Sequence, residues 1–139
     1  MKVKEIMHEG VECVAADTPV ELIAKTMLDA DIGAVPVRRD GRLIGIVTDR
    51  DITLRAVASG RDLHKLTASD VMTAGVTSCH DSTEIDDALQ MMETRHVRRL
   101  PVLNKNDQLV GMLSVGDLTG AMPRDVTAEL MQAVSAHHV

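Results

Sequence analysis

Short apolar runs alternate with one-sided helical patterns along the chain, and the same order of elements occurs in both halves. In the first half, apolar residues recur at helical spacing after Thr18 and Pro19, which suit the N-cap and first helical positions. We therefore predict a helix that ends between residues 31 and 33. The predicted buried face of this helix consists of Val20, Ile23, Ala24, Met27 and Leu28. Strands are predicted at residues 11–14, 34–37 and 43–47, and a second helix from residue 49 to about residue 58.

The second half repeats this order. The pattern predicts a helix over residues 83–96 and another after Ser114. The predicted strands cover residues 76–79, 100–103 and 109–113. A terminal amphipathic helix is predicted beyond Pro123, packing either on its own body or on a partner. Its apolar residues, spaced by four, are Val126, Leu130 and Val134.

The two halves are copies of one unit. A shift of 65 positions aligns Met7 with Met72, Gly10 with Gly75, Thr18 with Thr83 and Pro36 with Pro101. One inserted turn residue then makes the shift 66, which aligns Gly45 with Gly111 and Asp51 with Asp117. We predict an α/β (α+β) fold of two β-α-β-β-α repeats packed about a pseudo-twofold axis, with clefts at the seam, because neither repeat can cover both faces of its sheet alone. The predicted boundaries are residues 1–62 for the first repeat, 63–67 for a linker, 68–122 for the second repeat and 123–139 for a C-terminal helical tail.

One motif within the repeat carries candidate chemistry. The stretch 45–51 recurs as the stretch 111–117, and both keep a glycine, an apolar pair, a hydroxyl residue and an Asp three residues after the hydroxyl. This order is typical of a strand followed by a helix, with Thr48 or Ser114 as the N-cap and the Asp at the third helical position. Taken alone, each copy indicates a capping box. Its repetition in the same context also suits a binding site that is built twice, and the two interpretations are not exclusive.

Composition narrows the class of function. The chain has 139 residues, of which 45% are apolar and 26% charged, as in globular proteins with a buried core. A formal net charge of −6 argues against a general nucleic-acid binder, and the absence of Phe, Tyr and Trp removes the platforms on which single-stranded bases stack. Without a long apolar run, neither secretion nor membrane insertion is expected. We expect a cytoplasmic protein in which Cys13 and Cys79 are reduced and buried.

Catalytic and metal-binding motifs are not evident. The six histidines show no metal-ligand spacing: His8, His64, His80, His96, His137 and His138. Cys79 and His80 are adjacent, but no third group is present to orient the histidine as a base. We therefore expect no enzymatic activity, no catalytic residue, no metal and no cofactor.

These residues together resemble a known family, the tandem cystathionine β-synthase (CBS) domain pair, also called a Bateman module. The resemblance covers roughly residues 1–121. It rests on the β-α-β-β-α order found twice, on the two Gly-apolar-apolar-Thr/Ser-x-x-Asp endings, and on the segments 32–37 and 97–102 before each turn. With no catalytic or transport domain attached, the chain is similar to the stand-alone bacterial members, which typically form dimers.

The resemblance implies regulatory binding of an adenosine-containing ligand such as AMP, ADP, ATP, S-adenosylmethionine or NAD in the clefts between the repeats. In the family, the Asp binds the ribose hydroxyls and the Thr or Ser assists at the ribose or phosphate. This assigns Thr48 and Asp51 to one cleft, and Ser114 and Asp117 to the other. The chemistry is consistent, because a carboxylate accepts from two vicinal hydroxyls and a helix N-terminus favours an anion.

A basic residue that contacts phosphate often precedes the Leu-Pro-Val strand in this family. The second repeat has Arg98 and Arg99 at this position, whereas the first has Gly33 and Ala34, so we expect phosphate beside Asp117. The adenine pocket implied for the second cleft consists of Met112, Met7, Glu12 and Ile32. The pocket implied for the first cleft consists of Ile46, Met72, Thr77 and Val97.

Two hypotheses of function remain open. The first is a sensor that binds an adenosine nucleotide and changes the angle between repeats or subunits, which requires that the ligand prefer one arrangement. The second is a ligand-free dimeric scaffold with vestigial clefts. We expect a homodimer and allow for an unidentified protein partner, and we expect neither a nucleic acid nor a membrane as a partner.

Overall fold

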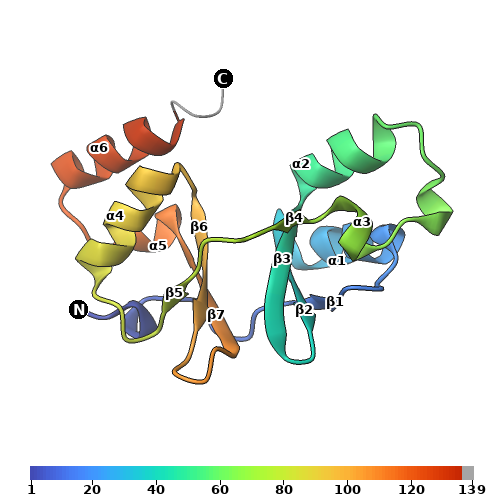
Figure 1. Ribbon diagram of the computed structural model, residues 1–139. Coiled ribbons are helices and arrows are strands. Elements are labelled where there is room, and N and C mark those ends of the chain that lie inside the picture. The colour runs from blue at the N-terminus through green and yellow to red at the C-terminus, as the bar shows by residue number, and fades with distance from the viewer. Residues whose placement is uncertain (136–139) are drawn as a thin grey trace. The chain divides into compact units, whose positions relative to one another are not determined.

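The computed structural model describes residues 1–135 and divides into two compact units (Figure 1). One unit consists of Glu12–Val76, and the other joins Met1–Val11 to Thr77–Val139. Each unit contains its own small sheet and its own helices, so the fold is the mixed α/β fold that was predicted. Among the described helices, none has both the length and the apolar character needed to cross a bilayer.

The unit Glu12–Val76 contains a four-stranded sheet in the order β1-β2-β3-β4. β1 runs parallel to β2, whereas β2 with β3 and β3 with β4 pair antiparallel. The strands are β1 (Val14–Ala15), β2 (Ala34–Arg39), β3 (Arg42–Thr48) and β4 (Thr73–Ala74). The helical elements are α1 (Val20–Ala30), α2 (Asp49–Asp51), the π-helical η2 (Ile52–Val57), the 3₁₀ turn η3 (Leu63–Lys65) and α3 (Ala68–Val71).

The other unit has a three-stranded sheet in the order β5-β6-β7, in which β5 is parallel to β6 and β6 is antiparallel to β7. The strands are β5 (Cys79–His80), β6 (Arg99–Leu103) and β7 (Leu109–Ser114). The helical elements are the 3₁₀ turn η1 (Val3–Glu5), α4 (Ile85–Arg95), α5 (Val115–Thr119) and α6 (Arg124–Ser135). The order β-α-β-β-α therefore occurs once in each unit, as the sequence pattern predicts.

Each unit has a separate hydrophobic core. In Glu12–Val76, one side of α1 packs with buried residues of β2 and β3. Val20, Ile23 and Met27 of the predicted helix face are buried, whereas Ala24 and Leu28 are exposed. The buried stripe is therefore narrower than predicted, because α1 has only one sheet face to cover and its opposite side faces outward.

The terminal helix α6 packs on its own unit, which is one of the two predicted alternatives. Leu130 and Val134 are fully buried in the same core as α4 and α5. The side chain of Val126, the third residue of the predicted stripe, lies outside the described part of the chain. The second repeat thus has α6 in addition to α4 and α5. Within residues 12–76, the first repeat has no counterpart of α6.

The leading segment of each repeat packs on the body of the other repeat. The Val3 N–H donates to the Thr83 carbonyl at 2.9 Å, and at the aligned positions the Ala68 N–H donates to the Thr18 carbonyl at 2.8 Å. Lys2 Nζ also lies 3.0 Å from Glu84 Oε1, and this hydrogen bond lowers the pKa of the Glu84 carboxyl. We call residues 1–11 and 66–76 the exchanged segments, because each completes the unit formed by the other repeat.

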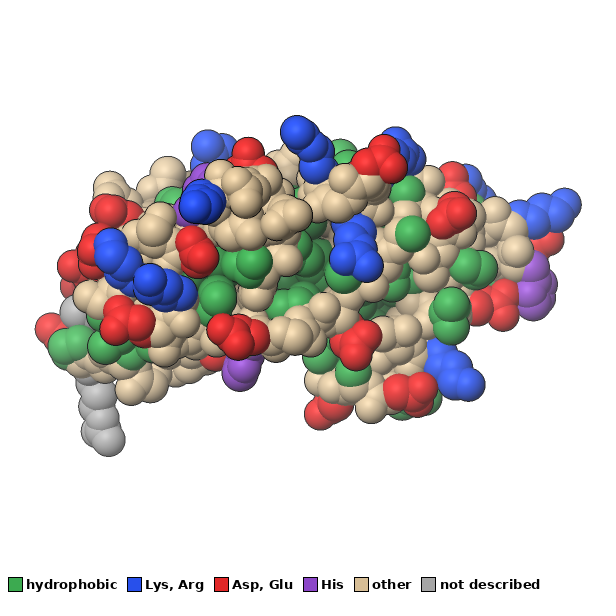
Figure 2. Space-filling model, turned by 90° about the horizontal axis from the view of Figure 1, so that it is seen from below, with side chains coloured by type: hydrophobic (Ala, Val, Ile, Leu, Met, Phe, Trp, Pro, Cys, Tyr) green, Lys and Arg blue, Asp and Glu red, His purple; other side chains and the backbone are tan. Residues whose placement is uncertain are grey.

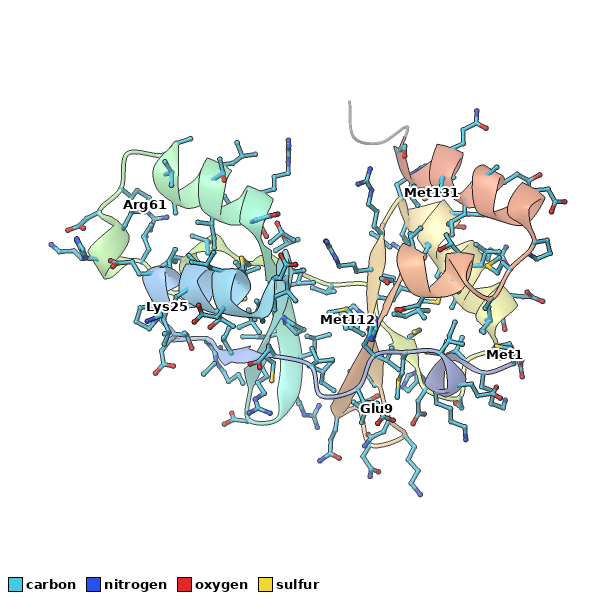
Figure 3. The ribbon with its side chains drawn as sticks, turned by 180° about the vertical axis from the view of Figure 1, so that it is seen from behind. Met1, Glu9, Lys25, Arg61, Met112 and Met131 are labelled. Carbon is cyan, nitrogen blue, oxygen red and sulfur yellow. The ribbon has the colours of Figure 1, made fainter. Side chains whose placement is uncertain are left out.

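The N-terminal exchanged segment crosses directly over β7 (Figure 3, where Met112 is labelled). The backbone of His8 forms both hydrogen bonds with Met112, at 2.9 and 3.0 Å. A Cβ on Gly111 would lie 2.7 Å from Met7 Sδ and 2.8 Å from the His8 carbonyl oxygen, which is closer than side-chain carbons approach. The glycine of the second motif is therefore required by the close passage of another backbone.

The same crossing occurs in the other unit. Thr73 of β4 pairs with Ile46 of β3, and a Cβ on Gly45 would lie 2.6 Å from Met72 Sδ and 2.9 Å from the Thr73 carbonyl oxygen. The strand β4 was not predicted, because its two residues are too few to show an alternating pattern and it exists only by pairing with β3. The glycine in each copy of the motif is the sequence feature that permits this close backbone pairing.

The start of α1 differs from the prediction. Pro19 occupies the N-cap position and Val20 is the first helical residue, so Thr18 is not the cap. The Thr18 carbonyl instead accepts the Ala68 N–H of the exchanged segment, and this contact holds Thr18 outside the helix. The leading strands also lie further along than predicted, at Val14–Ala15 and Cys79–His80, where they pair with β2 and β6.

Charged side chains of both signs are interspersed on the face shown in Figure 2. Lysine and arginine side chains on this face lie next to aspartate and glutamate side chains. Together with the net charge of −6, this leaves that face without the continuous basic surface that a nucleic-acid backbone needs.

We expect Gly111→Ala to destabilise the protein by about 1–3 kcal/mol, because the added methyl group forces apart β7 and the exchanged segment. Thermal or urea unfolding followed by circular dichroism measures this change. Gly120→Ala is the matched control: its Cβ would lie 3.8 Å from its nearest neighbour, the Asp117 carbonyl oxygen, so we expect little or no loss. Equal stability of Gly111→Ala and wild type would contradict the close crossing.

Candidate ligand-binding site

Both motifs form a strand followed by a helix with a reciprocal capping box, as predicted. In the first repeat, Thr48 Oγ1 accepts the Asp51 N–H at 3.0 Å and Asp51 Oδ2 accepts the Thr48 N–H at 2.9 Å. In the second repeat, Ser114 Oγ accepts the Asp117 N–H at 3.3 Å and Asp117 Oδ2 accepts the Ser114 N–H at 2.8 Å. Each box uses Oδ2 of the carboxylate and leaves Oδ1 available to a further donor.

The two carboxylates are largely buried. The side chain of Asp51 is 12% exposed and that of Asp117 is 10% exposed. Burial of a carboxylate is unfavourable unless donors surround it, so each needs partners beyond its own helix. In both repeats, these partners include a residue of the exchanged segment.

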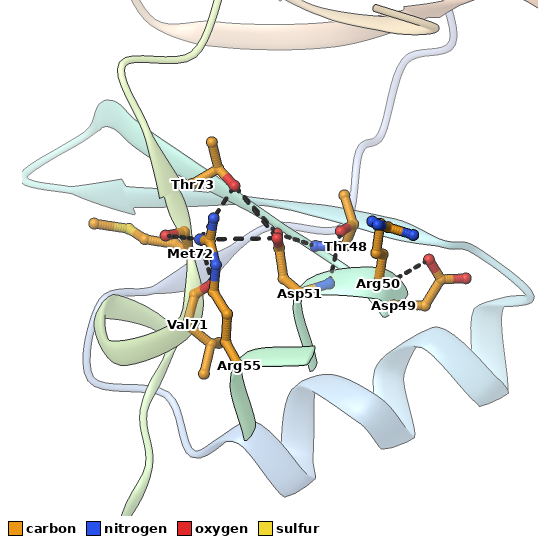
Figure 4. A network of polar contacts seen from close by, with 8 residues as sticks. All are labelled: Thr48, Asp49, Arg50, Asp51, Arg55, Val71, Met72 and Thr73. Atoms are coloured by element: carbon orange, nitrogen blue, oxygen red, sulfur yellow. Dashed lines mark hydrogen bonds and ion pairs between the residues drawn. The ribbon is translucent and has the colours of Figure 1, made fainter. Parts of the chain in front are cut away.

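In the first repeat, Asp51 belongs to a network with Thr73 and Arg55 (Figure 4). The Thr73 hydroxyl donates to Asp51 Oδ1 at 3.3 Å, and Arg55 Nη1 lies 3.8 Å from the same oxygen. Arg55 Nη1 also donates to the Met72 carbonyl at 2.8 Å and to the Val71 carbonyl at 3.1 Å. Arg55 therefore fixes the exchanged segment onto η2 and places a positive charge beside Asp51 at the same time.

In the second repeat, a histidine occupies the corresponding position. His8 Nε2 lies 2.9 Å from Asp117 Oδ1, whereas the imidazole itself is 75% exposed. His8 aligns with Thr73 under the shift of 65 positions. The residue that aligns with Arg55 is Ala121, so this repeat has no arginine at that position.

The arginines expected at a phosphate lie beside the second motif. Arg99 pairs with Ser114 across β6 and β7, and the Arg98 carbonyl accepts the Val115 N–H at 3.0 Å. Directly paired residues of antiparallel strands project from the same face of the sheet, so Arg99 and Ser114 share a face. Within residues 1–135, neither arginine side chain forms a hydrogen bond or an ion pair, and both are exposed. In the first repeat, Ala34 pairs with Thr48 in the same register.

The expected ligand residues divide between the two units. The unit that contains β7 holds Ser114, Asp117, Arg98, Arg99, Met7, Met112, Thr77 and Val97. The unit Glu12–Val76 holds Thr48, Asp51, Ile46, Met72, Glu12 and Ile32. Each unit therefore brings together its capping box and one exchanged methionine, Met7 or Met72, next to the motif glycine. Glu12 and Ile32, expected with Asp117, and Thr77 and Val97, expected with Asp51, each belong to the other unit.

Three polar residues of the sites were not foreseen: Arg55, Thr73 and His8. A signal for Arg55 is its position four residues after Asp51, the spacing at which side chains meet on a helix. The signal for the other two is the repeat itself, because both follow the aligned methionines Met7 and Met72 by one residue. The repeat does not identify the contacts of Thr73 and His8 with the Asp residues, because these contacts depend on the exchange of segments.

Cys79 and His80 do not form a nucleophile and base. Cys79 of β5 is buried in the core of its unit, and this burial raises the pKa of its thiol to about 11. His80 is exposed and its Nε2 lies 3.1 Å from Asp107 Oδ1. Cys13, expected to be buried, is half-buried. Among the residues that the structure describes, no three His, Cys, Asp or Glu side chains are placed to hold a metal ion.

A family model described as the CBS domain matches residues 3–57 and 68–124. The chain belongs to the CBS domain family. The two matches confirm the predicted tandem pair, and they cover both capping boxes. CBS domain-containing protein YhcV of Bacillus subtilis is 38% identical over 116 residues, which cover 84% of this chain and 81% of YhcV. Hypoxic response protein 1 of Mycobacterium tuberculosis is 32% identical over 132 residues, 94% of this chain and 92% of that protein.

Solved CBS structures have the same fold. The crystal structure of Hypoxic Response Protein I with two coordinated zinc ions matches with a TM-score of 0.80 and 33% identity, over 88% of this chain and 100% of that one. The crystal structure of CBSX2 in complex with AMP matches with a TM-score of 0.76 and 25% identity, over 86% of this chain and 94% of that one. Both comparisons span both CBS repeats of the present chain.

We expect only one of the two cysteines to react in the native CBS protein. At pH 8, a thiol with a pKa of about 11 is roughly 0.1% thiolate, and the Cys79 side chain is also shielded by the core. Mass spectrometry after iodoacetamide treatment should show one modification in native protein and two in urea. Cys13→Ser identifies the reactive site, because we expect this variant to resist native labelling. Rapid labelling of both thiols in the native state would argue against the described core.

Proposed function

We propose that this CBS domain protein is a regulatory module that binds an adenosine-containing ligand at its capped Asp motifs. The observation that carries the proposal is the pair of capping boxes, in which each Asp uses one oxygen for its own helix and directs the other to a donor outside that helix. The carboxylate oxygen that the capping box does not use can accept a hydrogen bond from a ribose hydroxyl. AMP in the related CBSX2 structure supports a ligand of the class AMP, ADP, ATP, S-adenosylmethionine or NAD.

The apolar part of the proposed site is aliphatic. Met7 and Met112 lie in the same unit as Asp117, and Met72 and Ile46 in the same unit as Asp51. Both methionines of the exchanged segments are partly buried against the core, so they have side-chain surface left for a purine. Methionine adapts its shape readily, which suits an adenine pocket without aromatic residues.

The proposed sites differ in their preference for phosphate. Arg99 shares a face with Ser114, and both Arg98 and Arg99 have guanidinium groups without an internal partner among residues 1–135. Gly33 and Ala34 occupy the aligned positions beside Thr48. We propose that a phosphorylated ligand binds beside Asp117 and that the site beside Asp51 favours ligands without phosphate.

Arg99→Ala should weaken AMP binding about tenfold, equivalent to about 1.4 kcal/mol, and leave adenosine binding nearly unchanged. Isothermal titration calorimetry with both ligands measures this difference. Arg39→Ala is a matched control, because Arg39 is also an exposed strand arginine but lies at the opposite end of β2 from Thr48. Equal weakening of AMP and adenosine would contradict the phosphate role, and no binding of either ligand at millimolar concentration would contradict the proposed function.

A ligand-free dimeric scaffold is the alternative, and one observation favours a homodimer. Large apolar side chains are exposed on the first repeat: Leu22 and Leu28 on α1, and Leu54 and Val57 on η2. The aligned residues of the second repeat are Asp87, Glu93, Gly120 and Pro123. Two copies of one fold thus differ in apolar character at the same positions, as expected if only the first repeat contacts a second chain. A dimer is compatible with both functions.

We expect Val57→Asp to weaken the homodimer, because the 60% exposed valine would place a charge in an apolar interface. Size-exclusion chromatography with light scattering, over a range of protein concentrations, gives the fraction of dimer. Met131→Asp is the control, since Met131 is 42% exposed on α6 of the other unit and should leave the dimer intact. If the wild-type protein is a monomer even at high concentration, the expectation of a homodimer is wrong.

A further inference from the structure

The two oxygens of Asp117 have different partners. Oδ2 accepts from the Ser114 N–H at 2.8 Å and from the Ser114 hydroxyl at 3.0 Å, so it is committed to the capping box. Oδ1 faces His8, whose Nε2 lies 2.9 Å away. The side chain of Asp117 is only 10% exposed, and the imidazole occupies a donor position at Oδ1 that a ligand hydroxyl would also use.

The imidazole of His8 is held by one contact, whereas its backbone is fixed. The N–H and C=O of His8 are both bonded to Met112 of β7, so the main chain cannot move without breaking the strand pairing. The side chain is 75% exposed, and within residues 1–135 its polar contact is with Asp117 alone. Rotation about the side-chain bonds of His8 therefore frees Oδ1 without any change in the fold.

The first repeat lacks such a removable group. Thr73 reaches Asp51 with a short side chain and a longer contact of 3.3 Å, and its hydroxyl can both donate and accept. Arg55 is anchored by the carbonyls of Val71 and Met72, so its charge stays beside Asp51 when a ligand arrives. A ribose at Asp51 can join this network without displacing it.

We propose that His8 is a removable occupant of the ligand site beside Asp117, and that an adenosine ligand binds there only when it displaces the imidazole from Oδ1. This inference rests on the proposed function. It makes the two CBS repeats unequal, because binding at Asp117 exchanges an existing hydrogen bond for a new one, whereas binding at Asp51 adds to a network that stays in place. His8 thereby lowers the affinity of the second repeat for any ligand that uses Asp117 Oδ1.

The test compares adenosine binding to single-site proteins. Asp51→Asn removes the charge of the first site and leaves the second for study, and Asp117→Asn does the reverse. In the Asp51→Asn background, His8→Ala and His8→Thr should each tighten adenosine binding about five- to tenfold, since a hydrogen bond to a charged group no longer has to be broken. In the Asp117→Asn background, Thr73→His should weaken adenosine binding, because it gives the first repeat the group that we propose to be inhibitory.

A second measurement follows the imidazole directly. The His8 ring resonances, assigned by their absence from the spectrum of His8→Ala, should shift when adenosine is added to the Asp51→Asn protein. Circular dichroism melting of every variant verifies that it is folded. Tighter binding in both His8 variants together with the ring shift supports the proposal.

Other outcomes overturn it in distinguishable ways. Unchanged or weaker adenosine binding in folded His8→Ala and His8→Thr shows that the imidazole is neutral or part of the site, and refutes the inference while the proposed function stands. Absence of binding to wild type and to all variants refutes the proposed function and the inference with it. In the Asp51→Asn background, binding that appears only after His8 is replaced supports the inference.

Discussion

The passage of each exchanged segment over a motif glycine is the contact on which the rest of the structure depends. At Gly45 and Gly111, one backbone lies so close to another that no side chain fits between them. This approach brings Thr73 and His8 to within hydrogen-bonding distance of the buried carboxylates. It also allows Met72 and Met7 to pack against the two cores. Core, sheet edge and candidate site are therefore built by the same crossing in each unit.

The buried carboxylates combine a structural role with the binding role that we propose for them. Each Asp completes the cap of its helix with one oxygen, and a cap alone does not require burial. A buried second oxygen without a hydrogen-bond donor would destabilise the folded state, and the exchanged segment supplies that donor. A ligand can therefore act at this position only by joining or replacing a protein group. That constraint links ligand occupancy to the contact between a repeat and the segment of its neighbour.

The internal duplication creates a comparison within one chain. Around Asp51, a threonine and an anchored arginine form a stable network, and no arginine stands at the strand position beside Thr48. Around Asp117, an exposed histidine contacts Oδ1 of the carboxylate and Arg99 pairs with Ser114. The capping geometry is the same around both carboxylates, so the difference between the sites lies in a few neighbouring side chains.

Local sequence was sufficient to predict the features that local physics determines. The hairpin strands β2, β3, β6 and β7, the long helices and both capping boxes follow from periodicity and from hydroxyl–carboxylate spacing. Thr18 was assigned wrongly as a cap because its carbonyl is used by Ala68, a residue far along the chain. His8 was missed for the same reason, since it meets Asp117 only through the exchange of segments, and the same exchange brings the Val71 and Met72 carbonyls to Arg55. The ligand residues beyond the capping boxes stay predictions.

The exchange of segments also bears on how such a chain could have arisen. The hydrogen bonds from Val3 to Thr83 and from Ala68 to Thr18 lie at aligned positions, so a chain with a single repeat could form the equivalent bond with a second copy of itself. Such a precursor would be a domain-swapped homodimer. Fusion of the two genes would convert an assembly that depends on concentration into an intramolecular one. Once the copies were fused, His8 and Thr73 could diverge independently, which identical subunits of a symmetric dimer cannot do.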